Sequence, residues 1–241
     1  MNVGLLHPGE MGAAIGAALV EAGHDVFWAS EGRSEATRER AAAFEDAGSV
    51  AEVIARCAIV FSVVPPHAAL ELARSLPPFD GIYVDANAVS PETARAVGKS
   101  VAWFVDGGIV GGPPAPRLYL SGDEAGAVAA LFTGSAIVTE IVANASALKC
   151  AYAAWTKGTS ALLLAIRDFA RTEGVEDALV TEWARSQPHL ADRLAAAERS
   201  AAKKGWRWIG EMEEIVQAFA ADGLPPGFHE AAAEIYRGTK S

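Results

Sequence analysis

The chain has 241 residues, 51% of them hydrophobic and 21% charged, which is enough for the core of one large domain or two modest ones. Its formal net charge is −10, whereas a nucleic-acid backbone is bound through clustered Lys and Arg. No apolar run has the roughly 18–20 residues of a membrane span, and the N-terminus does not resemble a signal peptide. We therefore expect a cytoplasmic protein that binds neither nucleic acid nor membranes.

The first part of the chain alternates between short strands and Ala-rich helices. The pattern predicts strands over residues 3–6, 24–29, 58–64, 81–85 and 101–106, with weaker candidates at 118–121 and 136–139. Helices are predicted over residues 11–22 and 35–46 and from Pro91 onward. The continuous apolar run 58–64 is typical of a strand buried on both faces of a parallel sheet. The alternation predicts an α/β domain of the Rossmann type, with a doubly wound, mostly parallel sheet.

The pattern changes near Asn144. From there to Arg171 it is helical, and one helix of about 28 residues would fit. Further helices are predicted over residues 177–186, 191–204, 209–221 and 228–236, separated by Gln187-Pro188, by Gly205 and by the segment 223–227. We expect a dinucleotide-binding domain over residues 1–142 and an all-helical substrate and dimerisation domain over residues 143–241.

The turn after the first predicted strand carries the strongest local motif. A dinucleotide fold places Gly-x-Gly-x-x-Gly there, because glycines let the backbone turn tightly and approach the pyrophosphate at the helix N-terminus. Gly9 and Gly12 match the second and third glycines, but His7 replaces the first, and Pro8 has no N–H for a phosphate. We interpret His7-Pro8-Gly9-Glu10-Met11-Gly12 as a cofactor-binding turn, with an ordinary strand–helix turn as the alternative.

The residues after the second predicted strand bear on the choice of cofactor. NAD-specific sites place an Asp or Glu there, on the ribose 2′-hydroxyl. Ser30, Arg33, Ser34 and Arg38 instead suit a 2′-phosphate, because guanidinium groups bind phosphate well. Glu31 favours NAD, because its carboxylate would repel a phosphate. We favour NADP and keep NAD open; a solvated helix face is the alternative for the two arginines.

Metal and disulfide chemistry have little support in the sequence. Cys57 and Cys150 are too few for a disulfide framework, and no Cys-x-x-Cys is present. The five histidines form no His-x-x-x-His or His-x-His pair, so a structural metal has no visible ligand set. We expect no metal site.

Five segments of the chain stand in the order and rough spacing of one known family. They are Gly9-x-Met11-Gly12 with Gly23-His24, Val63-Val64-Pro65-Pro66, residues 84–91, residues 106–112 and residues 147–153. Together they resemble the β-hydroxyacid dehydrogenase superfamily, which includes the 6-phosphogluconate dehydrogenase-like proteins and, more distantly, the imine reductases. The resemblance covers the N-terminal domain and the start of the long helix.

The resemblance implies an NAD(P)-dependent oxidoreductase that transfers a hydride between the nicotinamide and a small hydroxy acid or its keto form. It makes Lys149 the proton donor in reduction and the group that assists proton removal in oxidation, and it makes Asn87 a residue that orients the cofactor ribose or the substrate. The remaining candidates are Val64 and Pro65 for the cofactor and Gly111, Gly112 and Tyr152 for the substrate. It also implies a homodimer formed through the helical domain.

Two departures from the family pattern keep other functions open. Val110 replaces the usual serine before the paired glycines, and Ala153 replaces the usual asparagine after the lysine. An NADPH-dependent imine reductase is the first alternative, and a cofactor-binding protein without turnover is the second. A lysine lying along a partly buried helix is the alternative interpretation of Lys149, and Lys157 is the reserve candidate for its role.

Overall fold

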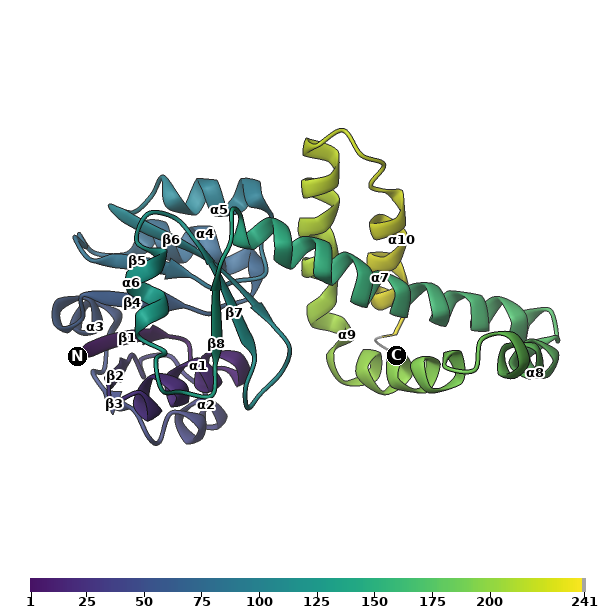
Figure 1. Cartoon of the computed structure of the whole chain (residues 1–241), viewed down its shortest axis with the longest axis horizontal. Coiled ribbons are helices and arrows are strands. Elements are labelled where there is room, and N and C mark those ends of the chain that lie inside the picture. The colour runs from purple at the N-terminus through teal and green to yellow at the C-terminus, as the bar shows by residue number, and fades with distance from the viewer. Residues whose placement is uncertain (240–241) are drawn as a thin grey trace. The chain divides into compact units, whose positions relative to one another are not determined.

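The computed structural model describes residues 1–239 of the chain. These residues form two compact units, Met1–Lys149 and a second unit that begins at Cys150. The first unit is a sheet covered by helices, and the second is built from helices (Figure 1). The division at residue 142 that the sequence analysis expects lies just before the long helix that enters the second unit.

The first unit is organised around one eight-stranded sheet. Its strands are β1 (Asn2–Leu6), β2 (Asp25–Trp28), β3 (Glu45–Asp46), β4 (Ile59–Ser62), β5 (Ile82–Asp85), β6 (Trp103–Val110), β7 (Arg117–Ser121) and β8 (Val138–Ile141). They lie in the order β3-β2-β1-β4-β5-β6-β7-β8, and every neighbouring pair is parallel except β6 and β7. The predicted Rossmann-type fold is confirmed. The strand order reverses between β1 and β4, which is where such sheets bind their ligands.

Helices cover both faces of this sheet. They are α1 (Glu10–Glu21), α2 (Glu35–Arg40), α3 (Val50–Arg56), α4 (Pro66–Ser75), α5 (Pro91–Gly98) and α6 (Ala125–Ala130). Side chains alternate between the faces of a strand, so Val3 and Leu5 of β1 pack with α1 and α6, while Leu6 packs with α3, α4 and α5. The apolar runs that predict the strands therefore fill two separate cores.

The region between β2 and α3 differs from its prediction. The helix expected over residues 35–46 ends at Arg40, and the chain then returns to the sheet as β3. Phe44 packs into the core against Gly16, and β3 pairs with Phe27 and Trp28. A strand of two exposed acidic residues has no hydrophobic pattern, so its pairing with β2 could not be read from the sequence.

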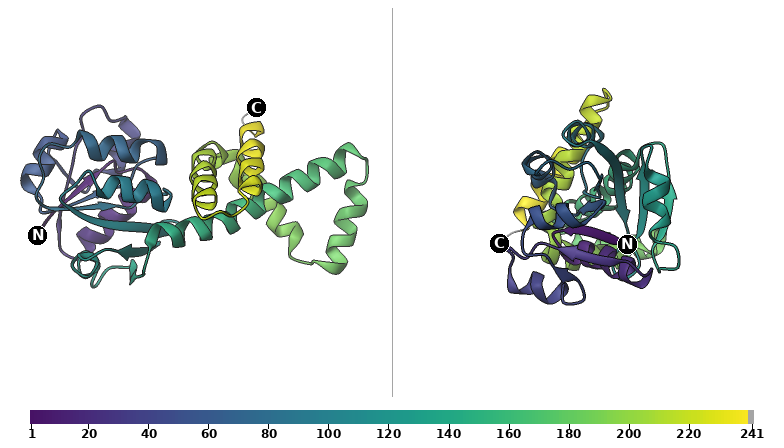
Figure 2. Two further views of the ribbon diagram at one scale, coloured as in Figure 1. Left: turned by 90° about the horizontal axis from the view of Figure 1, so that it is seen from above. Right: turned by 90° about the vertical axis from the view of Figure 1, so that its left-hand side faces the viewer.

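The second unit contains most of α7 (Ala145–Thr172), with α8 (Glu176–Ser186), α9 (Leu190–Ala221) and α10 (Gly227–Gly238). The long helix α7 is confirmed, and its length is 28 residues. Helices α9 and α10 pack side by side (Figure 2). The core of the unit lies among α7, α9 and α10 and includes Leu164, Met212, Ile215 and Tyr236.

One prediction in this unit is wrong, because Gly205 does not separate two helices. Helix α9 runs through it without a break for 32 residues. A Cβ atom on Gly205 would lie 3.0 Å from Oγ1 of Thr239 and 3.7 Å from Cδ1 of Tyr236. The glycine is therefore a packing residue that lets the C-terminal end of α10 approach α9, and the helix tolerates its conformational cost.

Candidate active site

The strand register places the candidate residues along one edge of the sheet. Leu6, Ser62 and Asp85 are the last residues of β1, β4 and β5 and are partners in the sheet, and Asp85 pairs with Asp106 in the middle of the longer strand β6. The cofactor turn follows Leu6, the Val64–Pro65 turn follows Ser62, and Asn87 follows Asp85. One row of strand ends therefore brings together segments that are far apart in the sequence.

The turn between β1 and α1 has the form that a pyrophosphate requires. Gly9 is the N-cap of α1, and a Cβ atom there would have no neighbour within 4 Å. A Cβ atom on Gly12 would lie 2.5 Å from the carbonyl oxygen of His7. Gly12 thus lets the helix approach the turn, while Gly9 leaves open space before a helix N-terminus, whose N–H groups and dipole favour anions. This arrangement fits a dinucleotide cofactor.

His7 occupies the position of the first fingerprint glycine. Its φ is 68°, and it is the one described residue other than glycine that has a positive φ. Its Nδ1 atom is buried and has no hydrogen-bond partner in the described part of the chain. Burial, with a smaller contribution from the charge of Arg33, lowers the pKa of His7 to about 4. The imidazole is therefore neutral near pH 7.

Arg33 and Ser30 meet after β2, at the position expected for the adenosine ribose. The carbonyl oxygen of Ser30 accepts hydrogen bonds from Nη2 of Arg38 at 2.9 Å and from the backbone N–H of Arg33 at 3.1 Å. The Nε atom of Arg33 is buried without a hydrogen-bond partner among the described residues, and burial lowers the pKa of its guanidinium. Arg38 thus supports the loop, whereas Arg33 is available to a ligand.

Two further side chains complete this region. Ser34 is exposed and lies at the N-cap of α2, with its Oγ 3.1 Å from Oγ1 of Thr37. Asp46 of β3 bonds to Ser30, which lowers the pKa of the Asp46 carboxyl group. Sequence analysis missed Asp46 because it did not predict β3. The Ser30 hydroxyl is therefore hydrogen-bonded within the protein, while the Ser34 side chain is exposed.

Asn87 links the ends of β4 and β5. Its buried side chain accepts a hydrogen bond from the backbone N–H of Val64 at 2.5 Å and donates one to Oγ of Ser62 at 3.1 Å. Its own backbone N–H donates to Oδ1 of Asp85 at 3.0 Å. The exposed Pro65, next to Val64, is the N-cap of α4. Asn87 thus fixes the turn that was predicted to contact the cofactor.

Lys149 lies one turn into α7, beside the glycine-rich part of β6. Its Nζ atom donates a hydrogen bond to the carbonyl oxygen of Ile109 at 2.8 Å. A Cβ atom on Gly108 would lie 2.8 Å from the carbonyl oxygen of Ala145 and 3.2 Å from Cβ of Lys149. The glycine therefore lets α7 lie close against β6. As a result, the lysine is held at the same sheet edge as the cofactor turn.

The start of α7 is anchored by Asp106. Its carboxylate accepts hydrogen bonds from the backbone N–H of Ser146 at 2.8 Å, from Oγ of Ser121 at 3.1 Å and from Oγ of Ser146. Ser121 in turn accepts from the backbone N–H of Ala145 at 3.0 Å. A carboxylate at a helix N-terminus also interacts favourably with the helix dipole. Sequence analysis did not assign this role to Asp106, although Asn144, whose Oδ1 accepts a hydrogen bond from the backbone N–H of Ala147 at 2.8 Å, is a recognisable helix start.

The substrate-binding candidates are less closely grouped. Gly111 follows β6 with a φ of 93°, and a Cβ atom on Gly112 would have no neighbour within 4 Å. Tyr152 is 42% exposed and belongs to the second unit. Both departures from the family pattern are buried, Val110 at the end of β6 and Ala153 in the hydrophobic core of the second unit.

Other features restrict the chemistry of the described residues. None of their helices is both long and apolar enough to cross a membrane. No group of three or more His, Cys, Asp or Glu side chains among residues 1–239 is arranged to hold a metal ion. Cys57 and Cys150 are buried and form no disulfide, and burial raises the pKa of Cys57 to about 11.

Comparison with known proteins is consistent with this geometry. Residues 2–89 match the family model described as NADP oxidoreductase, coenzyme F420-dependent, and residues 170–239 match a domain of unknown function, DUF1932. A solved structure of a conserved protein of unknown function, described as structurally similar to 3-hydroxyacid dehydrogenases, is 28% identical, with a TM-score of 0.74 over 100% of this chain and 97% of that one. The chain therefore resembles the β-hydroxyacid dehydrogenase superfamily, with family-model matches over residues 2–89 and 170–239. It is an NAD(P)-dependent oxidoreductase of the hydroxyacid dehydrogenase type.

Two less similar solved structures share the fold. The Mycobacterium tuberculosis 3-hydroxyisobutyrate dehydrogenase, solved with L-serine, is 19% identical with a TM-score of 0.71, over 98% of this chain and 92% of that one. The Aspergillus terreus reductive aminase, solved with NADPH and ethyl levulinate, is 17% identical with a TM-score of 0.60, over the same shares of the two chains. No curated protein sequence matches the chain.

Proposed function

We propose that the chain belongs to the β-hydroxyacid dehydrogenase superfamily and uses NADP to interconvert a small hydroxy acid and its keto form, with Lys149 moving the proton. The observation that carries the proposal is the position of Lys149. Its Nζ atom is held 2.8 Å from the carbonyl oxygen of Ile109, at the sheet edge where the Gly9–Gly12 turn fits a pyrophosphate. A proton carrier and a cofactor turn on one edge are what hydride transfer to a carbonyl requires.

The residues of the chain divide the remaining work. When bound, the nicotinamide supplies or accepts the hydride. In reduction, the Lys149 ammonium gives a proton to the carbonyl oxygen of the substrate; in oxidation, its neutral amine takes the proton from the hydroxyl group. The open backbone at Gly111 and Gly112 offers N–H groups to the substrate carboxylate. Asn87 positions the Val64 turn that borders the cofactor.

NADP is favoured over NAD by the residues after β2. The Arg33 guanidinium is partly buried, and its Nε has no hydrogen-bond partner among the described residues. An unpaired, partly buried cation is costly unless an anion compensates it. A 2′-phosphate supplies that anion, while a 2′-hydroxyl does not. The side chain of Glu31, which favours NAD in the sequence, is exposed.

Reduction of an imine is the second candidate activity. Val110 and Ala153 are buried and apolar at positions where hydroxyacid dehydrogenases carry serine and asparagine. Without these two polar groups, a hydroxy-acid substrate would have fewer hydrogen-bond partners. The fold shared with the Aspergillus terreus reductive aminase agrees with this alternative. Lys149 favours the carbonyl substrate, and activity assays with both substrate classes separate the two.

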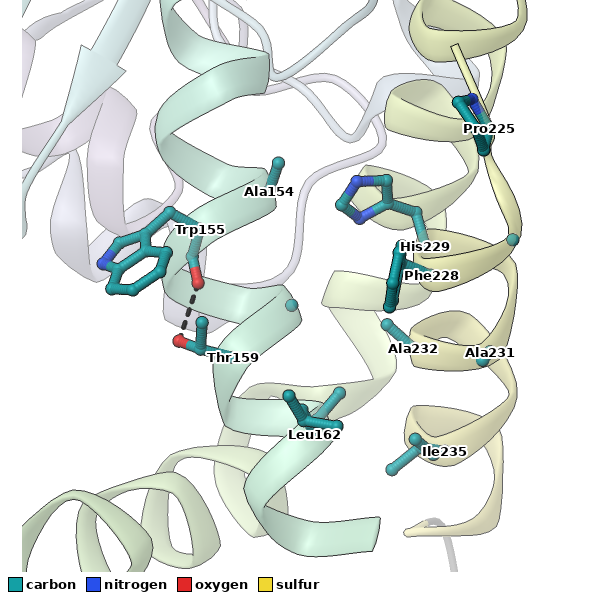
Figure 3. Close-up of a pocket in the computed structure, with 13 residues that line it drawn as sticks. Ala154, Trp155, Thr159, Leu162, Pro225, Phe228, His229, Ala231, Ala232 and Ile235 are labelled. Atoms are coloured by element: carbon teal, nitrogen blue, oxygen red, sulfur yellow. Dashed lines mark hydrogen bonds between the residues drawn. The ribbon is translucent and has the colours of Figure 1, made fainter. Parts of the chain in front are cut away.

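We also propose that the second unit forms a homodimer. A groove of about 580 Å³ lies between α7 and α10, and Trp155 and Phe228 beside it are 63% and 80% exposed (Figure 3). Its lining carries no formal charge, because burial lowers the pKa of His229, the one titratable residue there. Two copies that each carry a net charge of −10 can meet at such a surface without bringing like charges together. An exposed apolar patch of this kind marks an interaction surface.

The role of Lys149 is tested by replacing it with methionine. We expect Lys149→Met to lose turnover by about 10²-fold or more, the usual contribution of general acid–base catalysis, and to keep its Kd for NADPH. The measurement is NADPH consumption with keto acids and with cyclic imines, combined with fluorescence titration of the cofactor.

Lys157→Met is the matched control, because Lys157 lies on the same helix but pairs with Glu211 in the second unit. It should keep most of the activity. Full turnover by Lys149→Met, or a loss confined to Lys157→Met, would contradict the proposed mechanism. Reduction of cyclic imines without reduction of any keto acid would favour the second activity.

A further inference from the structure

His7 stands where the usual dinucleotide-binding fingerprint has its first glycine. We propose that His7 is a specificity-determining residue, whose imidazole binds the 2′-phosphate of NADP together with the Arg33 guanidinium. This inference rests on the proposed use of NADP. It adds a contact that the glycine of the usual fingerprint does not provide.

The fold places both side chains at the same part of the sheet edge. β1 and β2 are parallel neighbours, with Leu5 opposite Trp28. His7 stands two residues after Leu5, and Arg33 stands five residues after Trp28. In a fold of this type, the adenosine ribose lies beside the end of the second strand. The pKa of the His7 imidazole is lowered mainly by burial, and the positive charge of Arg33 adds a smaller contribution in the same direction.

Each of the two side chains has one buried nitrogen without a partner among the described residues. Nδ1 of His7 and Nε of Arg33 are both buried, and neither has a hydrogen-bond partner in residues 1–239. No carboxylate among those residues forms an ion pair with Arg33. Buried polar groups in native proteins are normally hydrogen-bonded, so each exception requires an explanation. An unpartnered nitrogen on each side chain is consistent with an acceptor of negative charge that the chain itself does not supply.

A phosphate group meets both requirements. It has several acceptor oxygens, so one oxygen can bind the guanidinium while another accepts the imidazole N–H. A ribose hydroxyl is neutral and has a single oxygen, which cannot compensate the charge of Arg33. Negative charge nearby also stabilises the protonated imidazole. Both nitrogens therefore favour the phosphorylated cofactor.

The backbone of His7 agrees with a functional side chain. A φ of 68° is natural for glycine, and it carries a conformational cost for a residue with a Cβ atom. Strained positions of this kind cluster at ligand sites, where the side chain or its direction is part of the mechanism. Glycine would make the same turn without strain, so packing of the turn does not explain a histidine at this position.

The experiment compares two cofactor fragments on the full chain. Binding of adenosine 2′,5′-bisphosphate and of adenosine 5′-monophosphate is measured by calorimetry for the wild type, His7→Gly, Arg33→Ala and the double variant. His7→Gly keeps the turn geometry, and His67→Ala is the control because His67 is exposed on α4. We expect His7→Gly to weaken the bisphosphate by about tenfold, the effect of one charge-assisted hydrogen bond, and to leave the monophosphate within about twofold.

Further variants show whether the two residues act on one group. If both bind the same phosphate, the double variant loses less affinity than the product of the two single losses. His7→Asn tolerates the same backbone conformation and keeps a side-chain donor. It should therefore retain part of the preference for the bisphosphate.

The outcomes separate the two proposals. Equal effects of His7→Gly on both ligands would show a role in the turn alone and would overturn the assignment of His7, as would no effect on either. In both cases the proposed use of NADP stands if Arg33→Ala still loses the bisphosphate preference. If the wild type binds the two fragments equally and Arg33→Ala changes neither, the proposed use of NADP fails together with the role of His7.

Discussion

At the scale of single residues, Asp106 connects the sheet to the helix that carries Lys149, the proposed proton carrier. It accepts three hydrogen bonds from Ser121 and Ser146, and these fix the first turn of α7. Lys149 follows Ser146 by three residues, so its Nζ reaches the carbonyl oxygen of Ile109 only while the helix starts where it does. Asp106 is therefore a positioning residue that acts through the helix rather than on a substrate.

The Asp106→Asn variant tests this role. An amide has one acceptor oxygen in place of two, so at least one donor loses its partner, and we expect the free energy of unfolding to fall by about 1–3 kcal/mol. Turnover should fall while the Kd for NADPH stays within about twofold, because the cofactor turn is on other strands. Urea unfolding and steady-state kinetics measure both effects, with exposed Asp123→Asn as the control. Unchanged turnover would remove Asp106 from the site.

At the scale of elements, two glycines in α9 have opposite consequences for stability. Gly205 faces Thr239 and Tyr236, whereas a Cβ atom on Gly210 would have no neighbour within 4 Å. Gly210→Ala should raise the free energy of unfolding by about 0.5–1 kcal/mol, because alanine loses less backbone entropy in a helix. Gly205→Leu should lower it by about 1–3 kcal/mol through overpacking.

Thermal unfolding of the two variants beside the wild type checks this pair. The midpoint should move up for Gly210→Ala and down for Gly205→Leu. Similar shifts in both variants would mean that the close approach of α10 to Gly205 does not contribute to stability.

Elements with a hydrophobic pattern could be predicted, and elements set by tertiary contacts could not. The apolar run of β4 and the alternation of helices and strands are properties of the residues themselves. By contrast, β3 exists because Phe44 enters the core and brings Asp46 beside Ser30. A glycine such as Gly205 weakens a helix wherever it occurs, so the sequence predicts a break there. The structure shows instead that the glycine lets α10 pack closely against α9.

The same distinction holds for the candidate site. Its turn and its lysine carry motifs that can be recognised, so their positions along the chain could be predicted. The hydrogen bonds of Asp106 and the unpartnered nitrogens of His7 and Arg33 depend on residues far apart in the sequence. Spacing alone does not reveal such contacts, because the register of the sheet decides them.

At the scale of the whole molecule, the proposed homodimer gives a test on the intact chain. Phe228→Glu places a charge beside the groove between α7 and α10, and we expect it to shift a dimer toward monomer by at least tenfold in Kd. Light scattering across a range of protein concentrations measures the mass. Val180→Glu on α8 is the control, because Val180 is 41% exposed and does not line the groove. A monomeric wild type at micromolar concentration would contradict the proposal.

The sheet order also determines when the cofactor turn is completed during synthesis. The cofactor turn directly follows β1. In the sheet, β1 lies between β2 and β4, and β4 ends only at Ser62. A nascent chain emerges from the ribosome in sequence order. One edge of β1 therefore has no hydrogen-bonded partner strand until β4 has been synthesised. A nicotinamide cofactor therefore cannot protect the newly made first strand from misfolding or proteolysis, and the early segments depend on their own burial or on chaperones.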